Sequence, residues 1–163
     1  MGPFQAVLFD WGGTLMSEDG PLDVSMGLWP EVRAIEGAEE TLAALAVDHR
    51  LAIATNATVS RRDMIERALE RVSLLRYITD VFCFTEIGAR KESPAFWSHV
   101  LASLHLEPRD VAMVGDTFEP DVLAPRRAGI FSVWFNEGGR NPLDAQDIPT
   151  IHDLPELVAL VRR

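Results

Sequence analysis

The sequence predicts an α/β fold, a doubly wound, Rossmann-like parallel sheet of about five strands with helices on its faces. Two features predict it. Short apolar runs, as expected of strands buried on both faces, alternate with longer segments whose apolar residues recur at helical spacing. Such alternation favours parallel strands joined by helical crossovers. The length of 163 residues suits a single core, so we expect one domain over residues 1–163.

The expected strands are continuous apolar runs at 4–9, 51–55, 81–84, 110–115 and 130–135. The helices are expected at 36–48, 60–72, 94–105 and 154–161. Ser60 is expected to cap the second helix, and Ser93 followed by Pro94 predicts an N-cap and first-turn proline for the third. Pro120 and Pro125 predict a short or kinked helix after the fourth strand, because proline disrupts a helix interior. The segments 17–30 and 136–149 are expected to be loops.

Charge and composition exclude several classes of partner. The formal net charge is −10, so binding to a nucleic-acid backbone or to an anionic membrane surface is not expected. Cys83 is the single cysteine, so the chain forms no internal disulfide. No apolar run reaches the ~20 residues of a membrane span, and the N-terminus does not resemble a signal peptide. We therefore expect a cytoplasmic protein.

Polar residues follow four of the expected strands, where ligands bind in parallel α/β sheets. In chain order they are Asp10, Thr55, Asn56, Lys91, Asp116 and Asp121. Lys91 is the only lysine among 15 basic residues, which suggests a role specific to a compact ammonium group. Taken singly, Asp116 and Asp121 also suit the first turn of a helix. Together, buried carboxylates and an ammonium are costly unless a ligand or metal uses them.

These residues resemble the four motifs of the haloacid dehalogenase (HAD) superfamily, in the same order and over nearly the whole chain. The matching stretches are "FDWGGTL", "IATN", Lys91 and "VGDTFEPD". The resemblance implies a HAD-like hydrolase in which Asp10 is the nucleophile and forms an aspartyl-phosphate. It implies a Mg²⁺ ion held by Asp10, Asp116 and the main-chain carbonyl of Gly12, with Asp121 close to these ligands but not bound to the ion directly.

The resemblance also implies a binding site for the phosphoryl group. Thr55 and Lys91 would hold the phosphoryl oxygens, and backbone amides around Trp11 and Asn56 would form a small anion-binding nest. The expected ligand is a phosphorylated small molecule or macromolecule.

Gly12 departs from the pattern of the family's phosphatases, which usually carry a second aspartate at this position as general acid and base. Its loss is expected to cost ~10²–10⁴ in rate. The protein is then a phosphatase limited to good leaving groups, or one in which a nearby acid (Glu18, Asp19 or Asp23) substitutes. The alternative is a catalytically impaired Mg²⁺- and phosphate-binding or regulatory module. Phosphonatase chemistry fits poorly, because it needs a second lysine, and dehalogenase chemistry has different neighbours of the nucleophile.

Only residues 16–35 are available for the cap that covers the active site in many relatives, so we expect a short flap and no cap domain. An open site would suit a large substrate, or a second subunit that covers it as part of a homo-oligomer. The apolar flap residues Met26, Leu28 and Trp29 are expected to pack against such a partner or, equally, against the chain's own core.

Overall fold

The structure, a computed structural model, describes residues 4–141 and 147–163. It contains a six-stranded sheet in the order β3-β2-β1-β4-β5-β6, with every neighbouring pair parallel. The strands are β1 (Ala6–Phe9), β2 (Arg50–Thr55), β3 (Asp80–Cys83), β4 (Val111–Gly115), β5 (Phe131–Phe135) and β6 (Thr150–Ile151). The predicted fold class is confirmed, and the five expected strands are present. The count of five is one too low, because β6 has only two residues and carries no recognisable strand pattern.

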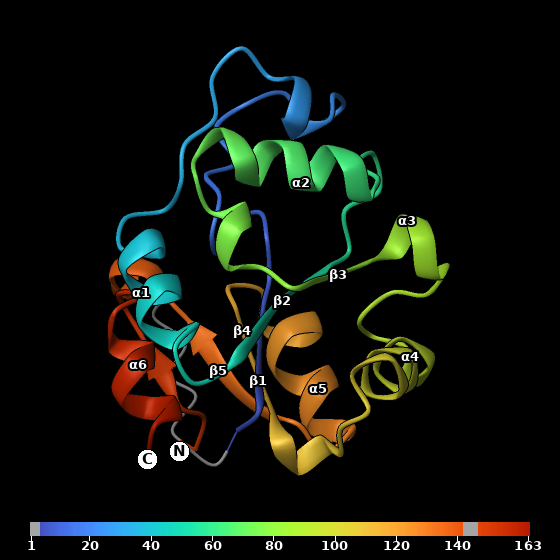
Figure 1. Cartoon of the computed structure of the whole chain (residues 1–163), viewed down its shortest axis with the longest axis vertical. Coiled ribbons are helices and arrows are strands. Elements are labelled where there is room, and N and C mark those ends of the chain that lie inside the picture. Colours follow the sequence, from blue (N-terminus) through green and yellow to red (C-terminus); the bar gives the residue numbers. More distant parts are fainter. Residues whose placement is uncertain (1–3, 142–146) are drawn as a thin grey trace.

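Six α-helices are present in the described part of the chain (Figure 1). They are α1 (Ala38–Leu45), α2 (Arg62–Arg71), α3 (Phe84–Ile87), α4 (Pro94–Leu104), α5 (Ala124–Arg127) and α6 (Glu156–Val161). The short α3 was not expected, since Phe84 reads as the end of the third strand. The expected loop at 136–149 contains a 3-10 turn, η5 (Glu137–Gly139), and its residues 142–146 lie outside the described part.

The strands bury both faces, which explains their continuous apolar runs. On β1, Val7 and Phe9 belong to one apolar cluster and Ala6 and Leu8 to another, as the two-residue period of a strand requires. The first cluster includes the buried side chains of α1, α2 and α6, and the second those of α4. The sheet is therefore covered on both faces, and its polar strand ends are held at one edge between two apolar layers.

Two of the expected helix signals are confirmed and one is wrong. The Ser93 hydroxyl accepts a hydrogen bond from Ala95 N at the start of α4, as predicted. The prolines after β4 interrupt the helix, which is a π-helical turn, η4 (Glu119–Leu123), followed by the short α5. Ser60 does not cap α2: its hydroxyl lies 2.8 Å from that of Ser25, so its side chain joins two loops instead.

The flap, residues 16–35, contains one 3-10 turn, η1 (Met26–Leu28), and packs beside α2 (Figure 1). Met26 and Trp29 are buried and Leu28 is exposed, so two of these three residues pack on the chain's own core. Arg71 of α2 donates to the carbonyl oxygens of Gly27 and Trp29. The flap is thus attached to the body of the protein by apolar packing and hydrogen bonds.

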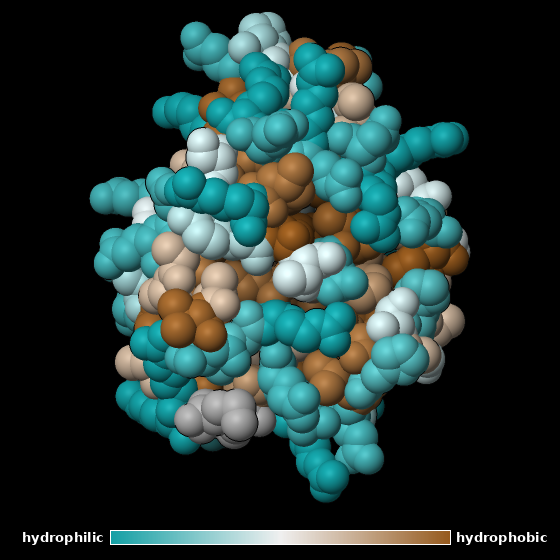
Figure 2. Space-filling model, in the orientation of Figure 1, coloured by the Kyte–Doolittle hydropathy of each residue, from teal (hydrophilic) through white to brown (hydrophobic). Residues whose placement is uncertain are grey.

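The visible surface is mostly hydrophilic, with hydrophobic residues showing near the middle of the face and in smaller areas toward its edges in Figure 2. Among the described residues, no helix combines the length and apolar character needed to cross a membrane.

Candidate active site

The predicted site residues line one pocket at the carboxyl edge of the sheet, with a volume of about 360 Å³. The parallel register places Phe9 of β1 beside Ile53 of β2 and Val114 of β4. The polar residues that follow these strands therefore meet. All eight predicted site residues line the pocket: Asp10, Trp11, Gly12, Thr55, Asn56, Lys91, Asp116 and Asp121.

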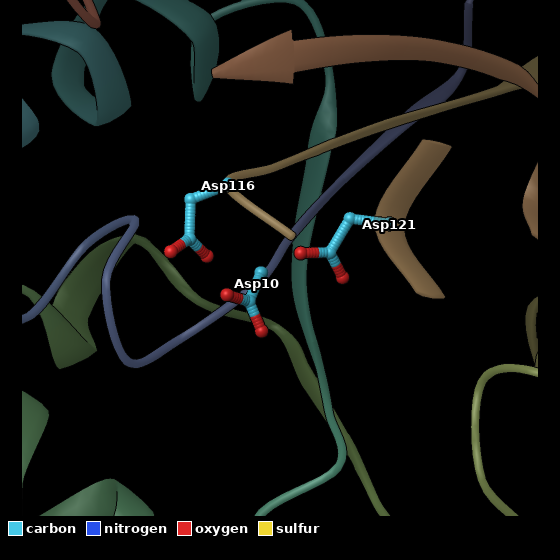
Figure 3. A group of neighbouring side chains, drawn as sticks. All are labelled: Asp10, Asp116 and Asp121. Carbon is cyan, nitrogen blue, oxygen red and sulfur yellow. The ribbon is translucent and has the colours of Figure 1, made fainter. Parts of the chain in front are cut away.

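Three carboxylates form the centre of the site (Figure 3). Asp10, Asp116 and Asp121 each place one oxygen so that these atoms lie within 4.8 Å of one another. Asp10 follows β1, Asp116 follows β4, and Asp121 lies in η4. Asp121 is fully buried and Asp10 nearly so. Such a group of hard oxygen donors suits a divalent cation such as Mg²⁺.

Lys91 is buried against these carboxylates, with 2% of its surface exposed. Its Nζ donates to Asp10 Oδ1 at 2.8 Å, to Asp121 Oδ1 at 2.5 Å and to the Ala54 carbonyl at 3.0 Å. An ammonium group has three protons, and all three are used by the protein. In this structure Lys91 therefore pairs with groups of the protein, the candidate nucleophile among them. A phosphoryl oxygen that binds Lys91 would have to replace one of these partners.

The loop before α4 holds Lys91 in place through its backbone. The Lys91 N–H donates to Asn56 Oδ1 at 2.7 Å, and the Trp97 indole donates to the Lys91 carbonyl at 2.6 Å. The Asn56 amide group also donates to Glu92 at 2.7 Å. Asn56 was predicted only as part of an anion-binding nest. The structure shows that its side chain joins the end of β2 to the lysine loop.

Two threonines near the carboxylates, Thr55 and Thr14, are placed differently. Thr55 Oγ1 accepts a hydrogen bond from Ala57 N at 3.1 Å, which fixes the turn after β2. Thr14 was missed by the sequence analysis, although it lies within the first motif. Its buried hydroxyl is 3.2 Å from Asp10 Oδ2 and 3.3 Å from Asp116 Oδ1. The pattern of an aspartate followed four residues later by threonine in a tight loop was the available signal.

Asp116 and Asp121 are each fixed by groups around them. The Trp134 indole donates to the Asp116 carbonyl at 3.1 Å, and Thr117 N donates to Asp121 Oδ2 at 3.0 Å. A methyl group on Gly115 would lie 2.3 Å from Asp121 Cγ. Glycine is required there because the carboxylate packs directly on the backbone.

The grouped charges shift the pKa values. Burial, and then the charge of Asp10, raise the pKa of Asp116 to about 8 and that of Asp121 to about 7. Burial alone would lower the pKa of Lys91, but the charges of Asp10 and Asp121 outweigh it and raise that pKa. With all four groups ionised the cluster carries a formal charge of −2. A divalent cation would therefore balance it.

Glu18 is the one acid of the three flap candidates that lines the pocket. A Cβ atom on Gly12 would lie 2.1 Å from Glu18 Oε1, so the Glu18 carboxylate occupies the space into which a side chain at position 12 would extend. Its partial burial, and then the charge of Asp10, raise its pKa. Asp19 instead pairs with Arg33 at the surface, and neither Asp19 nor Asp23 lines the pocket.

The chain is similar to several phosphatases in sequence. It is 28% identical to the N-acylneuraminate-9-phosphatase of Mus musculus over 143 residues, covering 83% of this chain and 56% of that protein. It is 32% identical to a phosphoserine phosphatase of Thermus thermophilus over 132 residues, covering 80% of this chain and 49% of that protein. The chain thus spans about half the length of these curated relatives.

Solved structures share the fold over nearly the full length of the chain. A protein of Listeria monocytogenes serotype 4b superposes with a TM-score of 0.78 at 27% identity, covering 97% of this chain and 98% of that one. A family model described as haloacid dehalogenase-like hydrolase matches residues 24–135, which is more than half of the sequence. The chain therefore belongs to the haloacid dehalogenase-like hydrolase family.

Proposed function

We propose that this protein is a Mg²⁺-dependent phosphohydrolase that acts through an aspartyl-phosphate on Asp10. The observation that carries the proposal is the buried pairing of Asp10 with Lys91, beside Asp116 and Asp121, on the floor of a pocket. The relatives named as phosphatases support the same reaction class. The substrates named for these relatives are not proposed for this chain, because the chain spans only about half of the relatives' length.

The residues present fit a Mg²⁺ ion. Asp10, Asp116 and the Gly12 carbonyl would hold it, and when bound it would neutralise charge on the phosphoryl oxygens. Asp121 suits a supporting role, because Lys91 and Thr117 N already use its two oxygens. The cluster's formal charge of −2 and its oxygen-only donors favour this cation over softer metals.

The chain's own groups account for the two chemical steps. An Asp10 carboxylate oxygen forms a bond to phosphorus while the bond from phosphorus to the leaving-group oxygen breaks. Lys91, whose Nζ donates to Asp10 Oδ1 at 2.8 Å, places a positive charge beside the nucleophile and so reduces its repulsion with the incoming phosphate. Water then attacks phosphorus, and phosphate leaves with restoration of the Asp10 carboxylate. The backbone N–H groups of Trp11 and Gly12, which donate to no other described backbone group, are available to the phosphoryl oxygens.

Glu18 takes the role of the missing general acid and base in this proposal. It gives its proton to the leaving oxygen in the first step and accepts one from the attacking water in the second. The support is geometric, since its carboxylate fills the space beside Gly12. Without such a group, turnover would be confined to substrates whose leaving oxygen needs no proton, such as acyl phosphates.

The test of the proposed function is a phosphatase panel in Mg²⁺ with acetyl phosphate, p-nitrophenyl phosphate and alkyl monoesters. We expect Mg²⁺-dependent turnover that is abolished in Asp10→Asn. If no substrate is turned over while beryllofluoride still binds, the protein is instead the Mg²⁺- and phosphate-binding module.

The role of Glu18 is tested separately. Glu18→Gln is expected to reduce alkyl-ester turnover by ~10²–10⁴, whereas acetyl phosphate, whose leaving oxygen needs no proton, should still transfer its phosphoryl group to Asp10 at close to the wild-type rate. The matched controls Asp19→Asn and Asp23→Asn change flap acids that do not line the pocket, and they should leave the rates unchanged. Adding Gly12→Asp to Glu18→Ala, which empties the space beside position 12, should restore alkyl-ester turnover. Equal turnover by Glu18→Gln and the wild type would show that Glu18 is not the acid.

A further inference from the structure

We infer that the natural substrate is a small phosphomonoester of an uncharged apolar alcohol, with no second anionic group. The inference rests on the proposed function, because it concerns the part of the same pocket that would receive the leaving group. Three observations carry it: exposed apolar side chains at the entrance, their fixed position, and a lining that, among the described residues, includes no cationic side chain besides Lys91.

The entrance of the pocket is apolar. Leu22 and Val24 of the flap and Val59 of the loop after β2 line it, and we call these three residues the apolar mouth. They are 71%, 40% and 49% exposed. In the described part of the chain, five large hydrophobic side chains are this exposed, and three of them surround this one opening. Exposed apolar side chains concentrated at a pocket mark a binding surface.

The apolar mouth is held in place before any ligand binds. The Trp29 indole donates to the carbonyl oxygens of Pro21, at 3.0 Å, and Val24, at 2.9 Å. These two residues lie on either side of Leu22 in the sequence. Across the entrance, the Ser25–Ser60 contact at 2.8 Å joins the flap to the loop that carries Val59. Because hydrogen bonds fix the backbone on both sides of the entrance, the protein would lose little conformational entropy when an apolar group binds there.

Charge limits what else the substrate carries. Four carboxylates line the pocket: Asp10, Glu18, Asp116 and Asp121. Among the described residues around it, Lys91 is the one cationic side chain, and its three protons are already used. None of the chain's 14 arginines lines it. A carboxylate or second phosphate on the substrate would therefore find no positively charged side chain to pair with.

The volume of about 360 Å³ lies at the small end of the range for ligand pockets, ~300–1,000 Å³. The phosphoryl group occupies the polar floor, which leaves room for one ring or a branched aliphatic chain. This favours a small molecule over a phosphorylated macromolecule.

The experiment measures binding, so that it does not depend on turnover. Titration calorimetry in Mg²⁺ compares phenylphosphonate, 4-carboxyphenylphosphonate and methylphosphonate, whose P–C bonds this chemistry does not break. Phenylphosphonate is expected to bind at least about tenfold more tightly than methylphosphonate, from burial of the ring. The added carboxylate should remove that gain. Leu22→Ser should reduce the gain about threefold or more, whereas Leu28→Ser, at an exposed flap residue that does not line the pocket, should preserve it.

Equal affinity for the three phosphonates, or tighter binding of the carboxylated one, would overturn the inference, as would no binding at all. Selective binding of phenylphosphonate together with no hydrolysis in the phosphatase panel would support the ligand class and contradict the proposed catalysis. The two failures are therefore distinguishable.

Discussion

Replacing a carboxylate of the site should stabilise the metal-free protein. Asp116→Asn removes one of three acidic groups that lie within 4.8 Å of one another and keeps an oxygen that accepts the same hydrogen bonds. In the absence of metal, the folded state confines these negative charges, whereas the unfolded chain exposes them to water. The variant should therefore unfold at a higher temperature than the wild type in EDTA.

The magnitude follows from the pKa of Asp116, which is raised from 3.8 to about 8. One unit corresponds to about 1.4 kcal/mol, and at pH 7 the difference from the unfolded value spans about three units. We expect Asp116→Asn to raise the free energy of unfolding by about 2–4 kcal/mol, the lower figure allowing for the partial exposure of Asp116. For a chain of this size that is about 5–10 °C in Tm.

The sign of the pH dependence follows from the direction of the shift. The folded protein holds the Asp116 proton more tightly than the unfolded chain, so the penalty is absent below about pH 4 and grows until about pH 8. The difference in Tm between variant and wild type in EDTA should therefore increase from pH 5 to pH 8. Saturating Mg²⁺ should reverse the order, because the wild type gains more from metal binding.

Differential scanning calorimetry of both proteins, with Asp23→Asn as a surface control, measures these quantities. A metal-free Asp116→Asn protein that is no more stable than the wild type at pH 8 would refute the electrostatic reasoning.

Three further predictions concern the surroundings of the cluster. Lys91→Met leaves Asp10 and Asp121 without their cation and should destabilise the protein by about 3–5 kcal/mol in urea unfolding; an unchanged midpoint would contradict this. Gly115→Ala places a methyl group 2.3 Å from Asp121 Cγ, so calorimetric titration should show weaker Mg²⁺ binding, and wild-type affinity would count against the predicted packing. Ser93→Ala removes the N-cap of α4 and should lower the free energy of unfolding in urea by about 1 kcal/mol. An unchanged free energy of unfolding would show that this cap does not stabilise the protein.

The fold, and the meeting of the candidate site residues in one pocket, were predictable because their signals are local. The runs that form β1, β2 and β4 are apolar on both faces, and Asp10, Thr55 and Asp116 follow or end them directly. Parallel topology then brings the strand ends together without further information. The single lysine among many arginines singled out Lys91, which the structure buries between the carboxylates of Asp10 and Asp121.

The remaining features depend on tertiary contacts that a linear pattern does not contain. Ser60 has the residue type of a helix cap, but its hydroxyl faces Ser25 on the flap. Glu18, Asp19 and Asp23 are equivalent acids by sequence, and the path of the flap brings Glu18 to the space beside Gly12. Strand β6 is defined by pairing with β5 rather than by its own two residues.

The central claim, that Asp10 is a nucleophile, is tested most directly by trapping the acyl phosphate. Glu18→Gln, which should slow the hydrolysis of the intermediate, is mixed with acetyl phosphate and Mg²⁺, quenched in acid and reduced with borohydride. Borohydride converts an aspartyl-phosphate to homoserine, so peptide mass spectrometry should find homoserine at position 10. Unmodified Asp10 in a protein that releases phosphate from acetyl phosphate, or reduction at another carboxylate, would contradict the account.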